Sequence, residues 1–424
     1  MPASPSTARV INDRLALRLL VQQGPLTAGQ LKQLTGLSRP SVADLVERLT
    51  ASGLIAVVGE SGEQRRGPNA KLYGIVADRA HLAALDVRTQ SVAVVVSDLV
   101  GRVLGEAAVP IDGGRGTGPA VEQAVALVER VVKEAGADRL HTVGIGAPGL
   151  IDPATGELRV SSGLPQWHRR LVAALQERLP EARVSVENET NLAALAEQRD
   201  GAARDRDTFV LLWLGHGTGA AVVLDGALRR GASGGTGEIG FLPVPGTGAL
   251  PSATDCAGGL HSLVGPAAVA ELAREHGVTA DAGEPSAAGL VRAAAEDEAG
   301  SAASAVPSAG SAGAGPDASP APPSAAPPGA RAASRFLDAL ADRVAVGVAS
   351  VVAVLDPGCV VLGGEVGQAG GERLAARVRE RVARMSPLPT EVRPGALGGG
   401  AVLRGALLTA RDRAQDELFA PPER

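Results

Sequence analysis

The sequence predicts a small helical module with a β-hairpin, followed by a larger α/β region. Residues 10–77 are dense in short helical patterns, whereas residues 80–270 alternate β-rich runs, Gly-rich turns and helical stretches. This alternation of strands and helices is typical of an α/β domain. We therefore expect a first domain at residues 1–78 and a second domain at residues 79–424.

The composition restricts the kind of protein this can be. The chain has 424 residues, of which 45% are hydrophobic and only 2% aromatic. So few aromatic side chains argue against a protein that stacks single-stranded nucleic acid. No apolar run is long enough to span a membrane, and residues 1–9 lack the apolar core of a signal peptide. Cys256 and Cys359 have no partner motif, so we expect a cytoplasmic protein with reduced thiols.

Charge is distributed unevenly along the chain. The net charge is −5, yet residues 1–80 contain 10 Lys and Arg against 6 Asp and Glu. A basic segment in front of an acidic body suits a DNA-binding module joined to a larger soluble domain. Because the excess is small, chance unevenness is the alternative explanation.

The start of the chain predicts two short helices. Residues 12–23 have an apolar side, and a Gly-Pro pair follows them. Thr27 can cap a second helix, which we expect to bury Leu31 and Leu34. Gly36 then supplies a tight turn.

A third helix completes the motif. Ser38 can cap it, and Pro40 is tolerated in its first turn, where the backbone N–H has no helical partner. Val42, Leu45 and Leu49 recur at helical spacing and should face the core. Two short helices joined by a Gly turn, the second capped and polar on its outer face, form a helix-turn-helix. A helical hairpin that packs against another protein is the alternative.

Two strands joined by a polar loop follow the third helix. Residues 54–58 and 71–75 read as strands, and the loop of residues 59–70 between them reads as a wing. In winged helix-turn-helix modules the start of the recognition helix reaches base edges, while wing cations meet phosphate or the minor groove. The candidate DNA contacts are Arg39 and Ser41 on bases, Ser38 on phosphate, and Arg65, Arg66 and Lys71 from the wing.

A low-complexity segment interrupts the second domain. Residues 299–330 are almost entirely Ala, Ser, Pro and Gly, so they cannot bury a core and we expect them to be disordered. After them, residues 334–355 read as a long helix. Cys359 to Leu362 read as a buried strand that Gly363-Gly364 closes.

Four Gly-rich or acidic segments punctuate the second domain: Asp86–Gln90, Thr142–Asp152, Val184–Glu197 and Gly215–Gly219. The second formally matches a dinucleotide-binding fingerprint. A true fingerprint opens a helix that holds the pyrophosphate, whereas turn residues follow here. We therefore reject a nicotinamide cofactor.

The order of these motifs resembles the ROK family (repressors, open reading frames and sugar kinases). The matching segments are a winged helix, Gly-Ala-Pro-Gly, Glu-Asn-Glu-Thr-Asn, Gly-His-Gly-Thr-Gly, Gly-Glu-Ile-Gly and Leu-Asp-Pro-Gly-Cys-Val-Val-Leu-Gly-Gly. Each motif is weak alone, but six in this order are specific, and they cover nearly the whole chain outside residues 280–333. The resemblance implies a bilobal actin/hexokinase-like ATPase fold, related to ribonuclease H, with sugar bound between the lobes. Family members with an N-terminal winged helix are mostly sugar-responsive repressors.

The resemblance also indicates that kinase chemistry is lost. Family kinases have an Asp-x-Gly-Gly-Thr loop whose glycines let the backbone approach phosphates, and here that loop reads Asp86-Val-Arg88-Thr-Gln. Glu189 stands where the kinases have their catalytic Asp. A carboxylate displaced by about an ångström can lower the rate on the order of a hundredfold. We therefore expect no catalytic residue and no ATP cofactor.

The sugar contacts carried over by the resemblance are Asn188, Glu189 and Glu238, with Pro148-Gly149 behind them. Helix capping is the alternative role for Asn188 and Glu189, because they lie where a strand enters a helix. The family's Asn-Leu-Pro-Gly-Trp reads Gly-Leu-Pro-Gln-Trp here, and Ser262 replaces a Glu. The resemblance therefore implies a pocket with an altered set of hydrogen-bonding groups.

The zinc site of the family is reduced. Phe241 replaces a zinc-binding His, and the cysteine cluster has shrunk to Asp255-Cys256 and His261. Structural zinc needs about four nitrogen or sulfur ligands. We therefore expect no bound metal, and we expect Cys256 to be a small buried residue.

These observations lead to one main hypothesis and two alternatives. The main hypothesis is a repressor of carbohydrate genes that binds double-stranded operator DNA as a homodimer or homotetramer and responds to a sugar or sugar phosphate. The first alternative is an ATP-dependent sugar kinase with a DNA-binding appendage, which would use Gly215–Gly219 and Gly363-Gly364 for its nucleotide. The second is a DNA-binding protein with a ligand-free, vestigial body.

Overall fold

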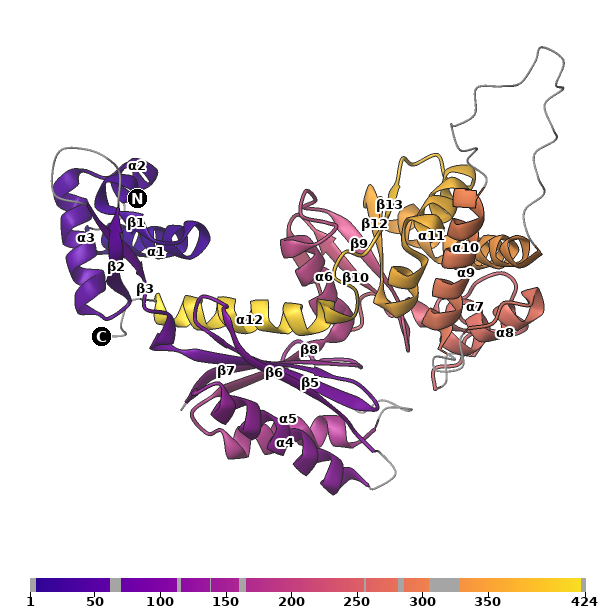
Figure 1. Cartoon of the computed structure of the whole chain (residues 1–424), viewed down its shortest axis with the longest axis horizontal. Helices are drawn as coiled ribbons and strands as arrows, with labels where there is room; N and C mark the ends of the chain where they lie inside the picture. The colour runs from indigo at the N-terminus through magenta and orange to yellow at the C-terminus, as the bar shows by residue number, and fades with distance from the viewer. Residues whose placement is uncertain are drawn as a thin grey trace, which may run out of the picture. The chain divides into compact units, whose positions relative to one another are not determined.

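The computed structural model describes residues 5–61, 70–112, 116–137, 139–159, 165–254, 257–280, 286–304 and 328–420. Internal contacts divide the chain into two compact units (Figure 1). Unit 1 comprises Met1–Ala147, Pro165–Glu187 and Ala406–Arg424, and unit 2 comprises Pro148–Leu164 and Asn188–Gly405. The winged helix is thus grouped with the first sheet, and the boundary at residue 78 stays a prediction.

The N-terminal part of unit 1 is a winged helix. Its helices are α1 (Pro5–Gln23), α2 (Ala28–Thr35) and α3 (Arg39–Ala51). Its strands are β1 (Leu26–Thr27), β2 (Ile55–Ser61) and β3 (Ala70–Ile75). The strands form a sheet of order β1-β3-β2, in which Tyr73 of β3 pairs with Leu26 on one side and Val57 on the other.

Three details of this module differ from the sequence prediction. Helix α1 begins at Pro5 rather than Asn12, and the two-residue strand β1 was not predicted because so short a strand has no periodicity of its own. Leu34 was expected to be buried but is 43% exposed, whereas Leu31 is 1% exposed. Helix α2 has only eight residues, so it buries one narrow stripe, and Leu34 lies outside it.

The rest of unit 1 is a five-stranded sheet of order β6-β5-β4-β7-β8. The strands are β4 (His81–Val87), β5 (Ser91–Asp98), β6 (Val103–Pro110), β7 (Leu140–Ala147) and β8 (Arg183–Asn188). Strands β4, β5 and β6 are antiparallel, and β7 runs parallel to β4. Figure 1 shows α4 (Thr117–Glu134) and α5 (Trp167–Arg178) on one face and α12 (Ala401–Leu418) on the other. Helix α12 approaches so closely that a Cβ at Gly144 of β7 would overlap the Ala406 carbonyl.

Unit 2 contains a second five-stranded sheet, of order β11-β10-β9-β12-β13. Its strands are β9 (Phe209–Leu214), β10 (Thr218–Leu224), β11 (Ala227–Arg229), β12 (Cys359–Gly363) and β13 (Glu391–Pro394). Strands β9, β10 and β11 are antiparallel, and β12 runs parallel to β9 and β13. In each sheet, three consecutive antiparallel strands are followed along the chain by two further strands, which lie beside the first strand of the three. This arrangement confirms the actin/hexokinase-like fold class.

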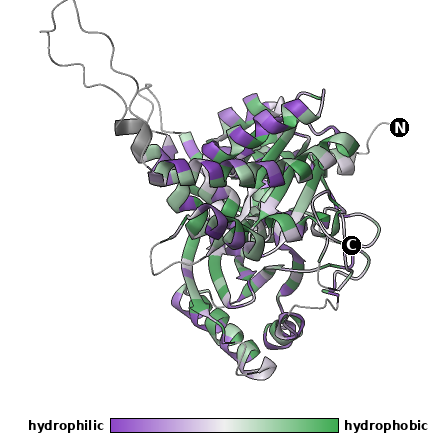
Figure 2. Cartoon of the chain, turned by 90° about the vertical axis from the view of Figure 1, so that its right-hand side faces the viewer, coloured by the Kyte–Doolittle hydropathy of each residue, from purple (hydrophilic) through white to green (hydrophobic). Residues whose placement is uncertain are grey.

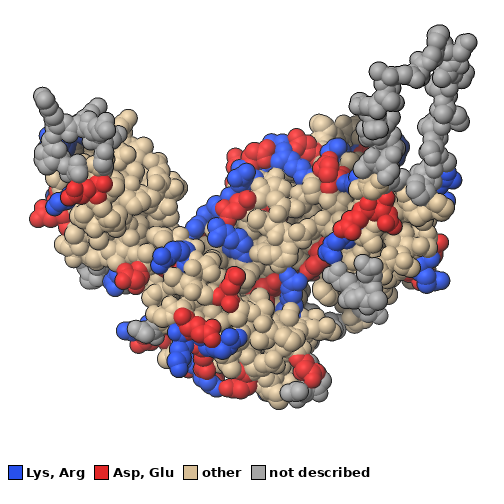
Figure 3. Space-filling model, viewed as in Figure 1, with Lys and Arg blue, Asp and Glu red and all other residues tan. Residues whose placement is uncertain are grey.

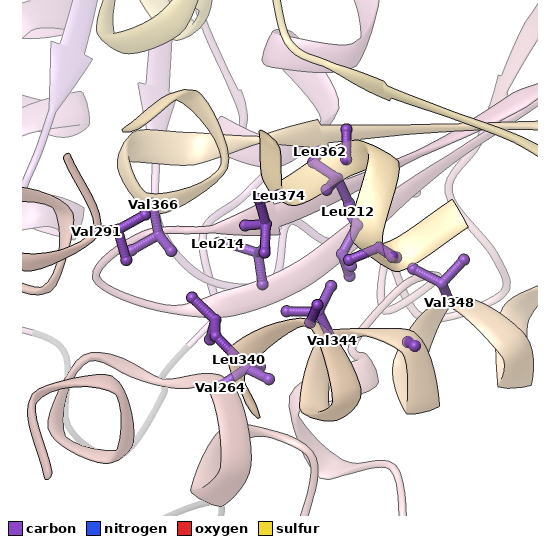
Figure 4. Packing of buried hydrophobic residues seen from close by; sticks show 14 of the residues in the cluster. Leu212, Leu214, Val264, Val291, Leu340, Val344, Val348, Leu362, Val366 and Leu374 are labelled. Atoms are coloured by element: carbon purple, nitrogen blue, oxygen red, sulfur yellow. The ribbon is translucent and has the colours of Figure 1, made fainter. Parts of the chain in front are cut away.

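Helices cover both faces of the second sheet. Helix α6 (Glu189–Asp200) contacts β9 and β10. The other helices of the unit are α7 (His261–Val264), α8 (Pro266–His276), α9 (Ala287–Ser304), α10 (Pro328–Leu355) and α11 (Gly364–Met385). Figure 4 shows Leu212 and Leu214 of β9 packed toward Leu340 and Val344 of α10. Full burial of such a side chain contributes about 1.5–3 kcal/mol.

Hydropathy follows these layers. In Figure 2 the strands are mainly hydrophobic, while the helices alternate between hydrophobic and hydrophilic residues. This is the pattern expected of helices that cover a buried sheet. Of the helices in the described part of the chain, none combines the length and apolarity needed to cross a membrane.

Both edges of the segment predicted to be disordered are helical. Residues 299–304 belong to α9, and α10 begins at Pro328, six residues before the predicted start. Alanine has the highest helix propensity, so the Ala-rich edges of the segment extend the flanking helices. The remaining residues, 305–327, lie outside the described part of the chain.

Candidate DNA interface and sugar site

The recognition helix α3 begins as the sequence predicts. The Ser38 hydroxyl accepts a hydrogen bond from the Ser41 backbone N–H at 3.3 Å and lies 2.9 Å from the Ser41 hydroxyl. Gly36 adopts a left-handed conformation with φ of 69°, which ends α2 and produces the sharp turn. These local bonds orient the first turn of α3 with its side chains outward.

The exposed start of α3 carries the predicted DNA contacts. Arg39 and Ser41 are exposed, while Val42, Leu45 and Leu49 are buried on the opposite side of the helix. The exposed Lys71 lies at the base of the wing, on β3. Arg65 and Arg66 lie outside the described residues. The geometry agrees with base contacts from Arg39 and Ser41, and each of these DNA contacts stays a prediction.

An ion pair that the sequence analysis missed holds α3 against α1. The Arg48 guanidinium contacts the Asp13 carboxylate at 2.7 Å and also pairs with Asp44. The hydrogen bond to Asp13 is the main cause that raises the pKa of Arg48 above its ordinary value. Because Asp13 and Arg48 are 35 residues apart, no local pattern could predict this pair.

The face of the molecule in Figure 3 carries charges of both signs. On the face shown in Figure 3, Lys and Arg residues alternate with Asp and Glu residues. Mixed charge gives a soluble surface rather than a broad attraction to nucleic acid. On this face, therefore, DNA binding has to come from local contacts.

Three of the predicted sugar-site residues are joined directly in unit 2. The Asn188 side chain caps α6, since its Oδ1 accepts hydrogen bonds from the backbone of Thr190 and Asn191 at 2.9 and 3.2 Å. Its Nδ2 donates to the Gly149 carbonyl at 3.1 Å and to Glu189 Oε2 at 3.0 Å. Asn188 therefore caps the helix and also holds Glu189 beside the Pro148-Gly149 turn.

Glu238 is brought to the same region by a glycine-rich loop. A Cβ at Gly235 would lie 3.6 Å from Leu150 and 3.8 Å from the Glu238 Cγ, so this glycine packs between the two residues. Solvent reaches Glu238, yet neighbouring protein atoms partly desolvate its carboxyl group and raise its pKa above the ordinary value. An accessible, partly desolvated carboxylate suits hydrogen bonding to ligand hydroxyls.

The first kinase-like loop is arranged differently from a phosphate cradle. Asp86 and Val87 belong to β4, so the turn starts only at Arg88. The Arg88 Nε donates to the buried Asp86 carboxylate at 3.0 Å, and the Arg88 carbonyl lies 3.3 Å from the buried His168 ring. The cation that could attract a phosphate is thus paired with a carboxylate.

The residues of the reduced zinc motif are only partly described. Asp255 and Cys256 lie outside the described residues, so the burial predicted for Cys256 stays a prediction. His261 begins α7, and burial lowers its pKa. Among the described residues, no group of three or more His, Cys, Asp or Glu side chains could hold a metal ion.

A buried carboxylate that the sequence analysis did not single out links α6 to α12. Glu197 is 1% exposed, and it accepts hydrogen bonds from the backbone of Ala202 at 2.7 Å, Ala396 at 3.1 Å and Leu397 at 2.9 Å. The last two residues lie before the short 3-10 helix Gly398–Gly400, which leads into α12. The end of the helix that starts at Glu189 is thereby fixed to the loop that leads into α12.

Sequence profiles of known families match both parts of the chain. The profile of the ROK family matches residues 82–413, and that of the MarR family matches residues 12–67. The first match covers most of the chain and includes every predicted sugar-site residue. The second contains α2, α3 and β2 and ends before β3.

Two curated relatives are repressors. The xylose repressor of Caldicellulosiruptor bescii is 25% identical over 236 residues, which are 55% of this chain and 59% of the relative. The N-acetylglucosamine repressor of Escherichia coli O6:H1 is 27% identical over 242 residues, 55% of this chain and 57% of the relative. The chain thus matches little more than half the length of these relatives.

Solved structures show the same fold. A ROK family transcriptional regulator, a homologue of the E. coli Mlc protein, aligns with a TM-score of 0.71 and 20% identity over 97% of this chain and 98% of its own. A ROK hexokinase from Thermus thermophilus aligns with a TM-score of 0.57 and 27% identity over 79% of this chain and 99% of its own. The chain belongs to the ROK family, with a MarR-like winged helix ahead of the family domain.

Proposed function

We propose that this protein is a sugar-responsive transcriptional repressor that acts in the cytoplasm on genes of carbohydrate uptake or metabolism. The observation that carries the proposal is the combination of two sites in one chain. One is the exposed, capped start of α3 with Arg39 and Ser41. The other is the cluster of Asn188, Glu189 and Glu238 in the ROK domain.

The winged helix supports the DNA-binding half of the proposal. Arg39 can donate two hydrogen bonds to guanine, and the Ser41 hydroxyl can contact a neighbouring base edge. Lys71 meets the phosphate backbone, together with Arg65 and Arg66 of the wing. Ser38 serves chiefly as the cap of α3, and its hydroxyl adds a phosphate contact.

The carboxylates of unit 2 support the sensing half. Glu189, oriented by Asn188, and Glu238 accept hydrogen bonds from sugar hydroxyls, while the Pro148-Gly149 turn forms the wall behind them. Because Glu189 stands where the family kinases carry Asp, we propose that the domain binds a sugar or sugar phosphate without phosphorylating it. No catalytic residue, no metal and no ATP are assigned.

The effector acts by changing the relative stability of two states of a dimer or tetramer. Helix-turn-helix proteins commonly bind two half-sites with paired recognition helices. A sugar alters DNA affinity only when it binds one of these states more tightly than the other. The coupling then changes operator affinity by a measurable factor.

Fluorescence anisotropy on a duplex from the gene's own upstream region tests this function. The measurement uses about 150 mM salt and a scrambled competitor, because protein–DNA affinity depends strongly on salt. A sugar panel follows and includes xylose and N-acetylglucosamine, the sugars in the names of the relatives. Specific binding that one sugar changes supports the proposal. Binding without sequence preference that Arg39→Ala leaves unaltered rejects the DNA-binding half.

The alternative is an ATP-dependent sugar kinase with a DNA-binding appendage. The 27% identity to a ROK hexokinase over 79% of this chain favours it. Formation of ADP that depends on a sugar would establish this activity. Specific DNA binding without stabilisation by any sugar or sugar phosphate would instead indicate a ligand-free body.

A further inference from the structure

The loop after β9 and the start of α11 together resemble a site for an anion. Gly215–Gly219 is a glycine-rich loop, and α11, which is kinked at Gly371, begins beside it at Gly364. Backbone N–H groups at a helix N-terminus and in a glycine loop attract phosphates. A nucleotide-binding member of this fold would be expected to place phosphate groups here.

Tight backbone packing fixes the start of α11 against this loop. Gly364 has φ of 76°, and a Cβ at this position would overlap the Leu214 carbonyl, which immediately precedes Gly215. Only glycine adopts this conformation at so little cost. The side chain of the next residue, Glu365, is consequently placed against the loop.

The carboxylate of Glu365 fills the space beside Gly215. A Cβ at Gly215 would overlap Glu365 Oε2, and that oxygen is shielded from solvent. A carboxylate in the first turn of a helix also interacts favourably with the positive end of the helix dipole. The chain therefore already supplies a negative charge at the position where a bound phosphate would lie.

We propose that Glu365 is an internal anion that closes the Gly215–Gly219 loop to nucleotide phosphates. A phosphate would have to displace the carboxylate or lie next to it, and like charges repel. The residues present thus do not fit a nucleotide, and no chemical step is derived through one. This inference concerns nucleotide binding only and stands or falls independently of DNA binding.

One feature of the same loop favours a ligand. The Thr218 hydroxyl oxygen is buried and has no hydrogen-bond partner among the described residues. A phosphate oxygen could satisfy it, and a buried polar group without a partner is unfavourable. The titration with nucleotide therefore has to include the unaltered protein, because tight binding by that protein would overturn the proposal.

The test is titration of the full chain with Mg²⁺·ADP by isothermal titration calorimetry. The variants are Glu365→Gly, which removes the carboxylate, and Glu365→Gln, which keeps the shape but removes the charge. We expect no saturable binding by the unaltered protein at about 1 mM nucleotide and binding by Glu365→Gly that is at least about tenfold tighter. Binding by Glu365→Gln should be intermediate.

Glu372→Ala is the matched control, because Glu372 lies in α11 just beyond the kink at Gly371, away from the loop, and pairs with Arg379 at the surface. It should behave as the unaltered protein. Circular dichroism verifies that each variant is folded, and Glu365→Gln keeps the test valid if Glu365→Gly is unstable. Binding by the unaltered protein as tight as by Glu365→Gly overturns the proposal. So does an absence of binding by both folded variants.

Discussion

At the residue scale, Asn188 caps α6 and also orients Glu189, a proposed ligand contact. Its oxygen accepts the backbone hydrogen bonds that start α6, and its nitrogen holds Glu189 and the Gly149 carbonyl. With its amide engaged in these bonds, Asn188 contributes to the proposed site mainly by orienting Glu189. The direct contacts to a sugar would then come from Glu189 and Glu238.

Arg39 is expected to determine sequence preference. Because a bidentate contact to guanine discriminates against other bases by about 1–3 kcal/mol, Arg39→Ala should weaken operator binding by that amount and leave non-specific binding nearly unchanged. Anisotropy titrations with operator and scrambled duplexes measure both affinities. Lys71→Ala is the informative comparison, since loss of a phosphate contact weakens both affinities and lowers the salt dependence by about one unit. Equal losses on both duplexes for Arg39→Ala would contradict base recognition.

His168 should make the folded state sensitive to mild acid. Its side chain is 2% exposed, and burial lowers its pKa below the ordinary value of 6.5. Below pH 6.5 the unfolded chain takes up a proton at this residue while the folded protein still resists it. Stability is therefore full above pH 6.5 and falls as the pH drops toward the lowered pKa of the folded state.

Thermal unfolding between pH 7.5 and 5.5 checks this prediction. The unfolding temperature should fall less steeply with pH in His168→Phe than in the unaltered protein. His216→Gln is the control, because His216 is exposed. Some pH dependence should remain, because burial also lowers the pKa of His141 and His261. Identical slopes for His168→Phe and the unaltered protein would show that His168 does not contribute.

At the element scale, Glu197 connects α6 to the start of α12. Glu197→Ala removes the acceptor of three backbone N–H groups, and buried donors without a partner are unfavourable. We expect the free energy of unfolding to fall by about 3 kcal/mol, measured by urea denaturation. The control is Glu372→Ala, an exposed ion pair worth about 1 kcal/mol or less. A loss no larger than that of the control would mean that other contacts hold the loop before α12.

At the scale of the whole molecule, the proposed sugar site and the proposed DNA contacts lie in separate elements, so the two functions should be separable by mutation. Glu238→Gln removes a charged acceptor from the proposed sugar site, far along the chain from α3. We expect the shift in unfolding temperature caused by the effector sugar to shrink, while operator affinity without sugar stays within about twofold. Thermal shift and anisotropy on the same preparation measure the two effects. Loss of operator affinity in the absence of sugar would show that the two functions are not separable in this way.

The sequence alone determined the features that depend on neighbours along the chain. The caps Thr27 and Ser38, the turn at Gly36 and the strands on either side of the glycine-rich loops rely on bonds that span a few residues. Such local hydrogen bonds and periodicities can be read directly from residue order. The ordered motifs then indicated the family and the two-part architecture.

Only the tertiary structure decided which distant groups meet. Strand order brings Gly149 to Asn188, the loop before α12 to Glu197, and Glu365 to Gly215. The packing of the helices in the winged helix leaves Leu34 exposed and pairs Arg48 with Asp13. These outcomes depend on which strands and helices become neighbours after folding. A linear pattern carries no such information, because contact between residues far apart is set by packing of whole elements rather than by local propensity.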